Sequence, residues 1–367
     1  MKISVVIGAR NEYPIILSTI YSFYEELEHW GYDFEFIVVD NMSTDNTAAI
    51  LKDRFRRWVR CGLLKVIEFN EKPANVLVRN IGARAATGDI VFLADAHLSI
   101  KLGTAHLMIQ GIQKHGGLWH TSTNIWGDTT DIRCRGYDLK LEEKFWGNLC
   151  KRVPDGAYGA PDPDCPDPLR LPNGKGQELL PYTVPMASHC CLAAAREEYL
   201  DFGGYHEGFK CYGGGEPYLD LKWWLFGSKA WIEPRGLVRH AFGINTHWRK
   251  VGGRKDFRAP VKVRDGGFKK MPGADEEYLH YSRGYGWNNE QVHHNFLLSA
   301  YCIGGYDWLQ KLYKRYWDIR KGNSRYIEDL KNIRSEVLKT GQEDRGFIQS
   351  RQKITLDEFL EQAPWLT

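Results

Sequence analysis

A carboxylate and an imidazole stand two residues apart at the end of a short apolar run. Residues 88–97 read GDIVFLADAH, which places Asp95 and His97 directly after five apolar residues. Side chains two apart in a strand point to the same side, so we expect this pair to face one crevice. A carboxylate and an imidazole can share a divalent cation. Mn²⁺ or Mg²⁺ suits a set completed by phosphate and water, and Zn²⁺ is also compatible. The alternative is a capped turn with a hydrogen-bonded histidine, because isolated pairs of this kind are common.

The elements that must position this pair alternate between strand and helix. Short apolar runs predict strands at 3–7, 36–39, 63–67 and 90–94. Apolar residues at helical spacing predict helices at 16–27, at 50–58 and from 73 to about 87. This alternation predicts an α/β fold with a mostly parallel central sheet flanked by helices. Ligands of such sheets bind beyond the carboxyl ends of the strands, where Asp40 and Asp95 both stand.

The remainder of the chain divides by composition. Patterning that resumes at residue 183 predicts a strand in CCLAAA, a helix at 216–226 and short strands at 231–232 and 237–238. We expect a catalytic domain at 1–245, a basic mobile loop at 246–275 and a helical C-terminal extension at 276–367. Thr355 and Glu358 form a capping-box pattern for the last helix.

Bulk properties narrow the class of protein only modestly. The chain has 367 residues, 26% charged residues and a net charge of +3, which favours no particular class of partner. The first residues lack the pattern of a signal peptide, and no apolar run reaches the roughly 18 residues of a membrane helix. We therefore expect a cytoplasmic protein with no membrane partner. The oligomeric state stays open.

Five ordered segments carry a resemblance to a known family. They are SVVIGARNE, IVVDNMSTDNT, VLVRNIGARAATGDIVFLADAH, the stretch from VPMASHCC to GGGEPYLDLKWWLFG, and AWIEPRGLVRHAFG. Together they span residues 3 to about 243 and resemble the GT-A glycosyltransferases, in the branch of family-2-like enzymes and polypeptide N-acetylgalactosaminyltransferases. The motif DxH replaces the commoner DxD. The resemblance implies a GT-A, Rossmann-like sheet and a nucleotide-sugar donor, most often a UDP-sugar.

The resemblance also implies a complete metal site. It makes His240 the third protein ligand beside Asp95 and His97, with Mn²⁺ or Mg²⁺ as the ion. A cation there would stabilise the negative charge of the departing nucleoside diphosphate.

Further residues are expected to contact the donor. The resemblance places Asp40 at the base, although Asp40 could instead cap the following helix. Arg79 is expected to face the nucleotide, with a surface arginine as the alternative. Glu12 belongs to the turn that lines the base or ribose and could alternatively cap its helix. The predicted contacts are completed by Ala9, Arg10, Ala94 and Gly215.

Glu216 is the expected catalytic or positioning carboxylate after the glycines of GGGEP. Its alternative role is capping of the helix that it begins. Inverting family-2 enzymes often carry Glu-Asp here, whereas this chain has Pro217 after the glutamate, and the overall match favours retention of configuration. Asp220, one turn on, could share the face of Glu216. His189 stands where the resemblance places small residues that line the sugar pocket.

The basic stretch from Trp248 to Lys270 resembles a lid. It carries nine Lys or Arg residues with interleaved aromatic side chains. Trp248, Arg249 and Lys250 are the lid candidates, with Arg249 expected to act in catalysis. A lid would exclude water from the donor. The run also fits a phosphate backbone, so a hydroxymethylated pyrimidine in DNA is the leading acceptor, followed by protein Ser/Thr and by an oligosaccharide.

Two other classes of function remain in view. A non-catalytic nucleotide-sugar or polyanion-binding protein would not need the full set of Asp95, His97, His240 and Glu216. A sugar-nucleotide pyrophosphorylase should carry a glycine-rich basic loop after its first strand, and GARNEYP does not match that pattern.

Overall fold

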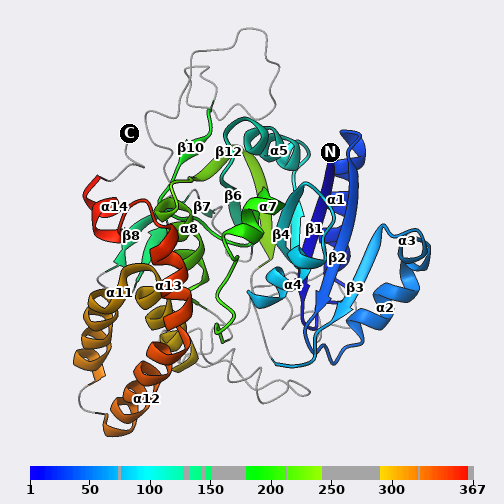
Figure 1. Cartoon of the computed structure of the whole chain (residues 1–367). Coiled ribbons are helices and arrows are strands. Elements are labelled where there is room, and N and C mark those ends of the chain that lie inside the picture. The colour runs from blue at the N-terminus through cyan, green and yellow to red at the C-terminus, as the bar shows by residue number, and fades with distance from the viewer. Residues whose placement is uncertain are drawn as a thin grey trace.

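A central β-sheet with helices on both faces forms the body of the protein (Figure 1). The computed structural model describes residues 1–72, 76–126, 132–134, 136–141, 145–149, 179–210, 213–241, 290–320 and 323–362. The predicted 246–275 loop lies outside these ranges. Within them, no helix is both long enough and apolar enough to cross a membrane.

The strands begin and end close to the predicted positions in the first hundred residues. Their bounds are β1 Lys2–Ala9, β2 Asp33–Asp40, β3 Leu64–Glu68, β4 Ile90–Asp95, β5 Leu98–Ile100, β6 Leu118–Trp126, β7 Ile132–Cys134, β8 Tyr137–Lys140, β9 Trp146–Leu149, β10 Tyr182–Thr183, β11 Cys191–Ala195 and β12 Ala230–Ala241.

The helices fall into an N-terminal set, which alternates with the strands, and a C-terminal set. Their bounds are α1 Ile16–His29, α2 Thr47–Arg54, α3 Arg56–Arg60, α4 Leu77–Ala85, α5 Thr104–His115, α7 Arg196–Asp201, α8 Gly215–Leu225, α11 Glu290–Arg320, α12 Ser324–Thr340, α13 Gln342–Arg351 and α14 Leu356–Gln362. The helix predicted at 50–58 is thus two short helices, α2 and α3.

The sheet is parallel in its N-terminal half and mixed beyond it. The strand order is β10-β12-β6-β11-β4-β1-β2-β3. β1 pairs in parallel with both β2 and β4, and β2 with β3, whereas β11 runs antiparallel to β4 and β6. The ends of β4, β1 and β2 therefore meet at one edge of the sheet, as predicted for the ligand-binding edge.

Each face of the sheet carries its own core, because apolar side chains fill both sides of the buried strands. Val5 and Ile7 of β1 pack with α1 and α5 on one face. Val6, between them, faces α4 and belongs to the core on the other face. This alternation along β1 is the two-residue period of a strand covered by helices on both sides.

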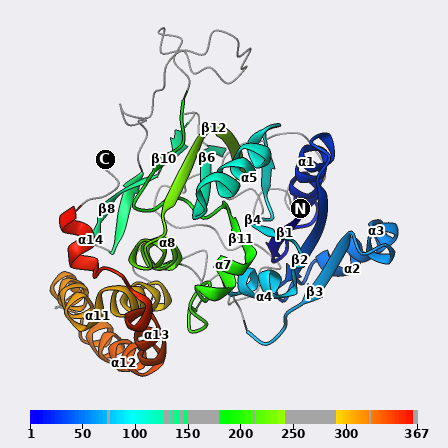
Figure 2. The same cartoon turned by 45° about the horizontal axis from the view of Figure 1, so that its top comes forward.

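The C-terminal helices lie beside α8, on the side of the molecule away from α2 and α3 (Figures 1 and 2). Their apolar side chains join the same core as α8. The expected capping box starts α14: Glu358 N–H donates to Thr355 Oγ1 at 3.2 Å, and Thr355 N–H donates to the Glu358 carboxylate at 2.7 Å. Within the predicted extension at 276–367, the described residues 290–320 and 323–362 form α11 to α14 and the turns between them.

One long strand, β12, replaces the two short strands predicted near residues 231 and 237. Its register against β6 shifts between Glu233 and Leu237, where the sequence has Pro234 and Gly236. A proline removes a ladder hydrogen bond, so the strand passes this point through a bulge rather than ending.

Candidate active site

The predicted site residues meet at one edge of the sheet because three strands end there in register. Ala9 lies opposite Asp40 in the β1–β2 pair, and Gly8 lies opposite Asp95 in the β1–β4 pair. Ala9 and Ala94 are buried backbone positions at this edge. Because the side chains at these two positions are small, the carboxylates of Asp40 and Asp95 are the larger groups at this edge.

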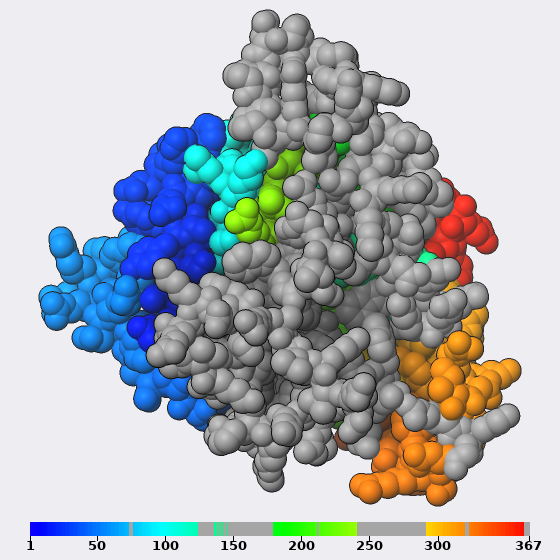
Figure 3. Space-filling view, turned by 180° about the vertical axis from the view of Figure 1, so that it is seen from behind, coloured from blue at the N-terminus to red at the C-terminus, as the bar shows by residue number. Residues whose placement is uncertain are grey.

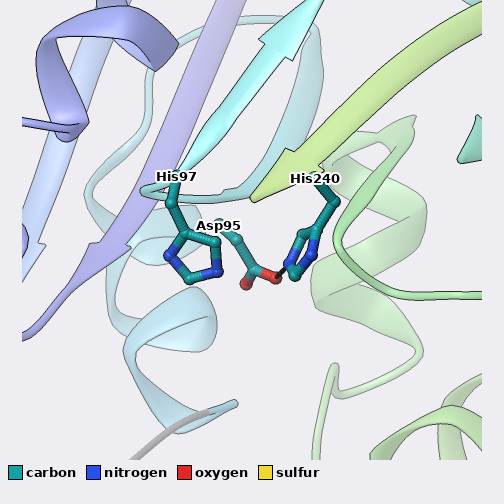
Figure 4. A group of neighbouring side chains, drawn as sticks. All are labelled: Asp95, His97 and His240. Carbon is teal, nitrogen blue, oxygen red and sulfur yellow. Dashed lines mark hydrogen bonds and ion pairs between the residues drawn. The ribbon is translucent and has the colours of Figure 1, made fainter. Parts of the chain in front are cut away.

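Asp95, His97 and His240 converge from three directions (Figure 4). One ligand atom from each lies within 4.8 Å of the other two. His240 Nε2 is 3.1 Å from Asp95 Oδ2, and the rings of His97 and His240 are 4.7 Å apart between centroids. β4 ends at Asp95, so His97 reaches the group from the following turn and not from the predicted extension of the strand.

β12 supplies His240 because it pairs with β5, the strand that follows this turn. His240 lies opposite Leu98 in that pair. Cyan and yellow-green atoms, the colours of the segments around β5 and β12, adjoin at the surface beside the blue N-terminal segments (Figure 3). A carboxylate and two imidazoles at such a place fit a divalent cation that keeps positions open for oxygen ligands.

The charges around Asp95 hold it as a carboxylate. Burial opposes its ionisation, but Arg79, followed by His240 and His97, outweighs burial and keeps the pKa of Asp95 well below its usual range. Arg79 Nη2 donates to Asp95 Oδ1 at 2.7 Å. Asp95 therefore offers a charged oxygen ligand, with one oxygen held by Arg79 and the other facing His240.

A second carboxylate fixes His97. Its Nδ1 lies 3.2 Å from Glu12 Oε1. Burial disfavours the imidazolium, yet Glu12 overcomes that effect and raises the pKa of His97 to about 9. Glu12 makes no side-chain cap on α1. Its carboxylate is the kind of outer partner that orients a metal-binding imidazole.

Two glycines let α4 lie close to β1, which brings Arg79 to the site. A Cβ at Gly8 would stand 2.6 Å from Val78 Cγ2, and one at Gly82 would stand 2.1 Å from Val6 Cγ1. Arg79 is 4% exposed, and its Nη1 also donates to Tyr205 Oη at 3.1 Å. The surface alternative for Arg79 is therefore excluded. Nothing in the sequence marked Tyr205 as its partner.

The turns after β1 and β2 are joined to each other. Asn11 has a positive φ of 58°, and its Oδ1 accepts from Thr44 N–H at 2.6 Å, while Asn11 N–H donates to Ser43 Oγ at 2.8 Å. Arg10 lies in the first of these turns and is partly exposed. The two turns thus form one continuous wall beyond the strand ends.

Asp40 is buried at this wall, and its two carboxylate oxygens differ in their surroundings. Its Oδ1 accepts from Ser43 N–H at 3.0 Å, whereas its buried Oδ2 has no hydrogen-bond partner among the described residues. Burial raises the pKa of Asp40. The alternative role as a helix cap is not what the structure has, since α2 begins at Thr47 with Asn46 as its N-cap.

Glu216 lies in the first turn of α8. Gly213 and Gly214 both have positive φ, 91° and 75°, and a Cβ at Gly214 would stand 2.6 Å from the Asn295 carbonyl oxygen. Gly215, which is buried, is the first residue of α8. Burial raises the pKa of Glu216 to about 7, with Arg79 opposing the shift and Asp220 and Asp95 adding to it.

His189 and Asp220 turn inward. His189 Nε2 lies 2.8 Å from Asp220 Oδ1, and Asp220 is fully buried in α8. His189 is thus 5% exposed, and Asp220 does not present its carboxylate beside Glu216 at the surface. Both residues were candidate site residues in the sequence analysis, but nothing in the sequence predicted the hydrogen bond between them. The lid candidates Trp248, Arg249 and Lys250 lie outside the described residues.

Comparison with known proteins places this chain in a family. The family described as Glycosyl transferase family 2 matches residues 4–197, which is more than half of the chain. The chain is 28% identical over 214 residues to the human protein named probable polypeptide N-acetylgalactosaminyltransferase 8, covering 56% of this chain and 31% of that one. It is 25% identical over 248 residues to the Drosophila melanogaster protein named N-acetylgalactosaminyltransferase 7, covering 66% and 39%. The chain therefore spans between about a third and two fifths of the length of these relatives.

A solved structure has the same fold. The crystal structure of GalNAc-T7 with UDP, GalNAc and Mn²⁺ superposes with a TM-score of 0.55 at 17% identity, over 96% of this chain and 58% of that chain. The fold is thus a GT-A glycosyltransferase fold, and the resemblance inferred from the motifs is confirmed. This chain belongs to glycosyl transferase family 2.

Proposed function

We propose that this chain is a metal-dependent glycosyltransferase that moves a hexose from a UDP-sugar to a hydroxyl group of a macromolecular acceptor. The observation that carries the proposal is the convergence of Asp95, His97 and His240 at the carboxyl edge of a GT-A sheet. A relative of the same fold is described as holding UDP and Mn²⁺. Mn²⁺ or Mg²⁺ bound by these three residues would stabilise the charge of the departing diphosphate.

Each remaining site residue has a role in binding or orientation. Arg79 holds Asp95 in place through their 2.7 Å hydrogen bond and adds positive charge to the diphosphate side of the site. Asp40 offers its buried Oδ2 to a donor group of the base. Ala9, Arg10 and Glu12 line the base and ribose, and Ala94 and Gly215 leave room for the donor. We propose that Trp248, Arg249 and Lys250 close over the diphosphate and exclude water.

Glu216 is proposed to position the donor sugar or the acceptor hydroxyl. A carboxyl group with a pKa of about 7 can both accept and donate a hydrogen bond near neutral pH. Pro217, which follows it, has no group that can accept a proton. Pro217 therefore cannot act as the general base that inverting family-2 enzymes carry at this position. We propose retention of configuration because of the overall match to the N-acetylgalactosaminyltransferase branch, including the DxH motif and His240.

Nucleic acid is the proposed acceptor class. The stretch from Trp248 to Lys270 has more positive charge than a diphosphate requires, and its aromatic residues could stack on bases. A hydroxymethylated pyrimidine in DNA would supply the hydroxyl. A Ser or Thr hydroxyl of a protein is the second candidate, because a relative is named as a polypeptide N-acetylgalactosaminyltransferase.

Donor hydrolysis tests the proposal. A panel of UDP and GDP sugars would be incubated with Mn²⁺, with and without duplex DNA that contains hydroxymethylated pyrimidines. We expect Mn²⁺-dependent release of UDP from one donor, faster with the DNA and retained in Asp89→Asn, an exposed position at the far end of β4. A rate of UDP release that is the same with and without DNA would favour a protein or a glycan as the acceptor. Tight nucleotide binding without hydrolysis of any donor would favour the non-catalytic alternative.

A further inference from the structure

A second group of side chains of the types that bind metal ions lies inside the protein. His120 in β6, His189 before β11 and Asp220 in α8 place one ligand atom each within 4.8 Å of the others. His120 and Asp220 are fully buried and His189 is 5% exposed. None of the three belongs to the group of Asp95, His97 and His240.

Both imidazoles present the same nitrogen to one carboxylate oxygen. His189 Nε2 lies 2.8 Å from Asp220 Oδ1, and His120 Nε2 lies 3.2 Å from that same oxygen. The two rings are nearly parallel, at 11°, with centroids 5.3 Å apart. Three ligand atoms from separate elements thus face one point.

In His189 and Asp220, the polar atom that points away from this group already has a hydrogen-bond partner. Tyr205 Oη lies 2.7 Å from His189 Nδ1, and Asp220 Oδ2 accepts from Ala187 N–H at 2.7 Å. Ligands of metal ions in proteins typically have such partners on the atom that does not bind the ion, since these partners fix the tautomer and the ring orientation.

Of the inner groups, only the His120 ring lacks a hydrogen-bond partner in the described protein, whereas His189 Nε2 and Asp220 Oδ1 pair with each other at 2.8 Å. Neither nitrogen of His120 makes a hydrogen bond to any described residue, although the ring is fully buried. A buried polar group without a partner costs free energy. A cation between His120 and Asp220 would give Nε2 of His120 a partner and so reduce this cost.

We propose that His120, His189 and Asp220 bind a second divalent cation, of the zinc type, inside the fold. The donor set is the same as in the group of Asp95, His97 and His240, but here all three residues are buried. A buried set of two imidazoles and one carboxylate suits Zn²⁺, which takes few ligands, better than Mg²⁺ or Ca²⁺, which require six or more oxygen ligands. The ion connects β6 and the segment before β11 to α8, the helix that begins with Glu216. Its role is structural, and the inference does not depend on the proposed function.

Metal counting in variants tests this site. Protein freed of metal would be titrated with Co²⁺, read by visible absorption, and with Zn²⁺, read by elemental analysis. We expect two equivalents in the wild type, one in Asp95→Asn, which disables the open group, and one in Asp220→Asn. His115→Gln, an exposed histidine five residues before His120, should keep two.

The Asp95→Asn variant decides the matter even if substitutions at the buried group prevent folding. It should retain one tightly bound equivalent, and removal of that ion should lower Tm by about 5 °C. An Asp95→Asn protein that folds with no bound metal would overturn the proposal. The three residues would then be an ordinary buried histidine–aspartate network, with a proton in place of the ion.

Discussion

Arg79 donates a 2.7 Å hydrogen bond to one oxygen of Asp95 and leaves the other oxygen facing the site. The guanidinium is almost fully buried, whereas the carboxylate is 27% exposed at its side chain. The hydrogen bond from buried Arg79 therefore fixes the orientation of the Asp95 carboxylate and keeps it ionised. An oxygen ligand of a cation needs both properties.

Replacement of Arg79 should therefore weaken both folding and cation binding. Arg79→Gln removes a charged hydrogen bond to Asp95 and one to Tyr205, so we expect a loss of about 2–3 kcal/mol in the free energy of unfolding. The pKa of Asp95 should rise, because Arg79 is the main group that lowers it. Urea denaturation and Mn²⁺ titration measure the two effects. Arg84→Gln is the control: it lies on the same helix in an exposed pair with Glu207, and should cost less than about 1 kcal/mol. Equal effects of the two substitutions would contradict the orientation of Asp95 by Arg79.

Replacement of Glu216 should stabilise the protein in a pH-dependent way. Burial raises the pKa of Glu216 from 4.5 to about 7, so ionisation of this group costs the folded state free energy as pH rises between these values. Glu216→Gln cannot ionise, and should gain about 3 kcal/mol over the wild type above pH 7 at about 1.4 kcal/mol per pKa unit. No such gain is expected below pH 4.5. Thermal unfolding across this range is the measurement. Glu197→Gln, at an exposed position in the first turn of α7, is the matched control and should change the free energy of unfolding by less than about 0.5 kcal/mol.

Replacement of Asp40 should separate nucleotide binding from stability. The buried Oδ2 of Asp40 has no partner in the described protein, and burial raises its pKa. Asp40→Asn keeps an oxygen for Ser43 N–H and removes a buried charge, so stability should not fall. Affinity for UDP should fall about tenfold, or about 1.4 kcal/mol, by calorimetry. Asp53→Asn, exposed on α2, should change neither quantity. Unchanged UDP affinity in Asp40→Asn would contradict the proposal that Asp40 contacts the base of the nucleotide.

The C-terminal helices should be part of the folding unit that holds Glu216. Leu309 of α11 is fully buried in the core shared with α8, whereas Ile319 of the same helix is 59% exposed. Leu309→Ala should cost about 2–5 kcal/mol, and Ile319→Ala less than about 0.5 kcal/mol. A single unfolding transition in both variants, shifted only for Leu309→Ala, is the expected result. Two separate transitions would show that α11 to α14 fold apart from the sheet.

Much of the N-terminal half was predictable because its signals are local. Short apolar runs in strands and single apolar stripes in helices can be recognised from short windows. The bounds of β1, β2, β3 and β4 lie within three residues of the expected ones. The grouping of Asp40 with Asp95 followed from a general property of parallel sheets.

Relationships that depend on long-range pairing could not be predicted in this way. His120 has no motif around it, and it meets His189 only because β6 pairs with β11, a neighbour distant in sequence. Tyr205 contacts Arg79 across an even longer separation in sequence. The sequence predicts two strands where the structure has the single strand β12, because Pro234 and Gly236 interrupt the apolar pattern. The strand continues because it pairs with β6 on both sides of this interruption.

The most direct measurement is Mn²⁺-stimulated hydrolysis of the preferred nucleotide sugar by His240→Ala, beside His29→Ala as an exposed histidine at the end of α1. His240→Ala should lose at least about 100-fold in stimulated rate while it unfolds at nearly the wild-type temperature, because a ligand of the charge-stabilising cation has been removed. His29→Ala should match the wild type. Full Mn²⁺-stimulated hydrolysis by a folded His240→Ala protein would contradict the assignment of Asp95, His97 and His240 as the metal site.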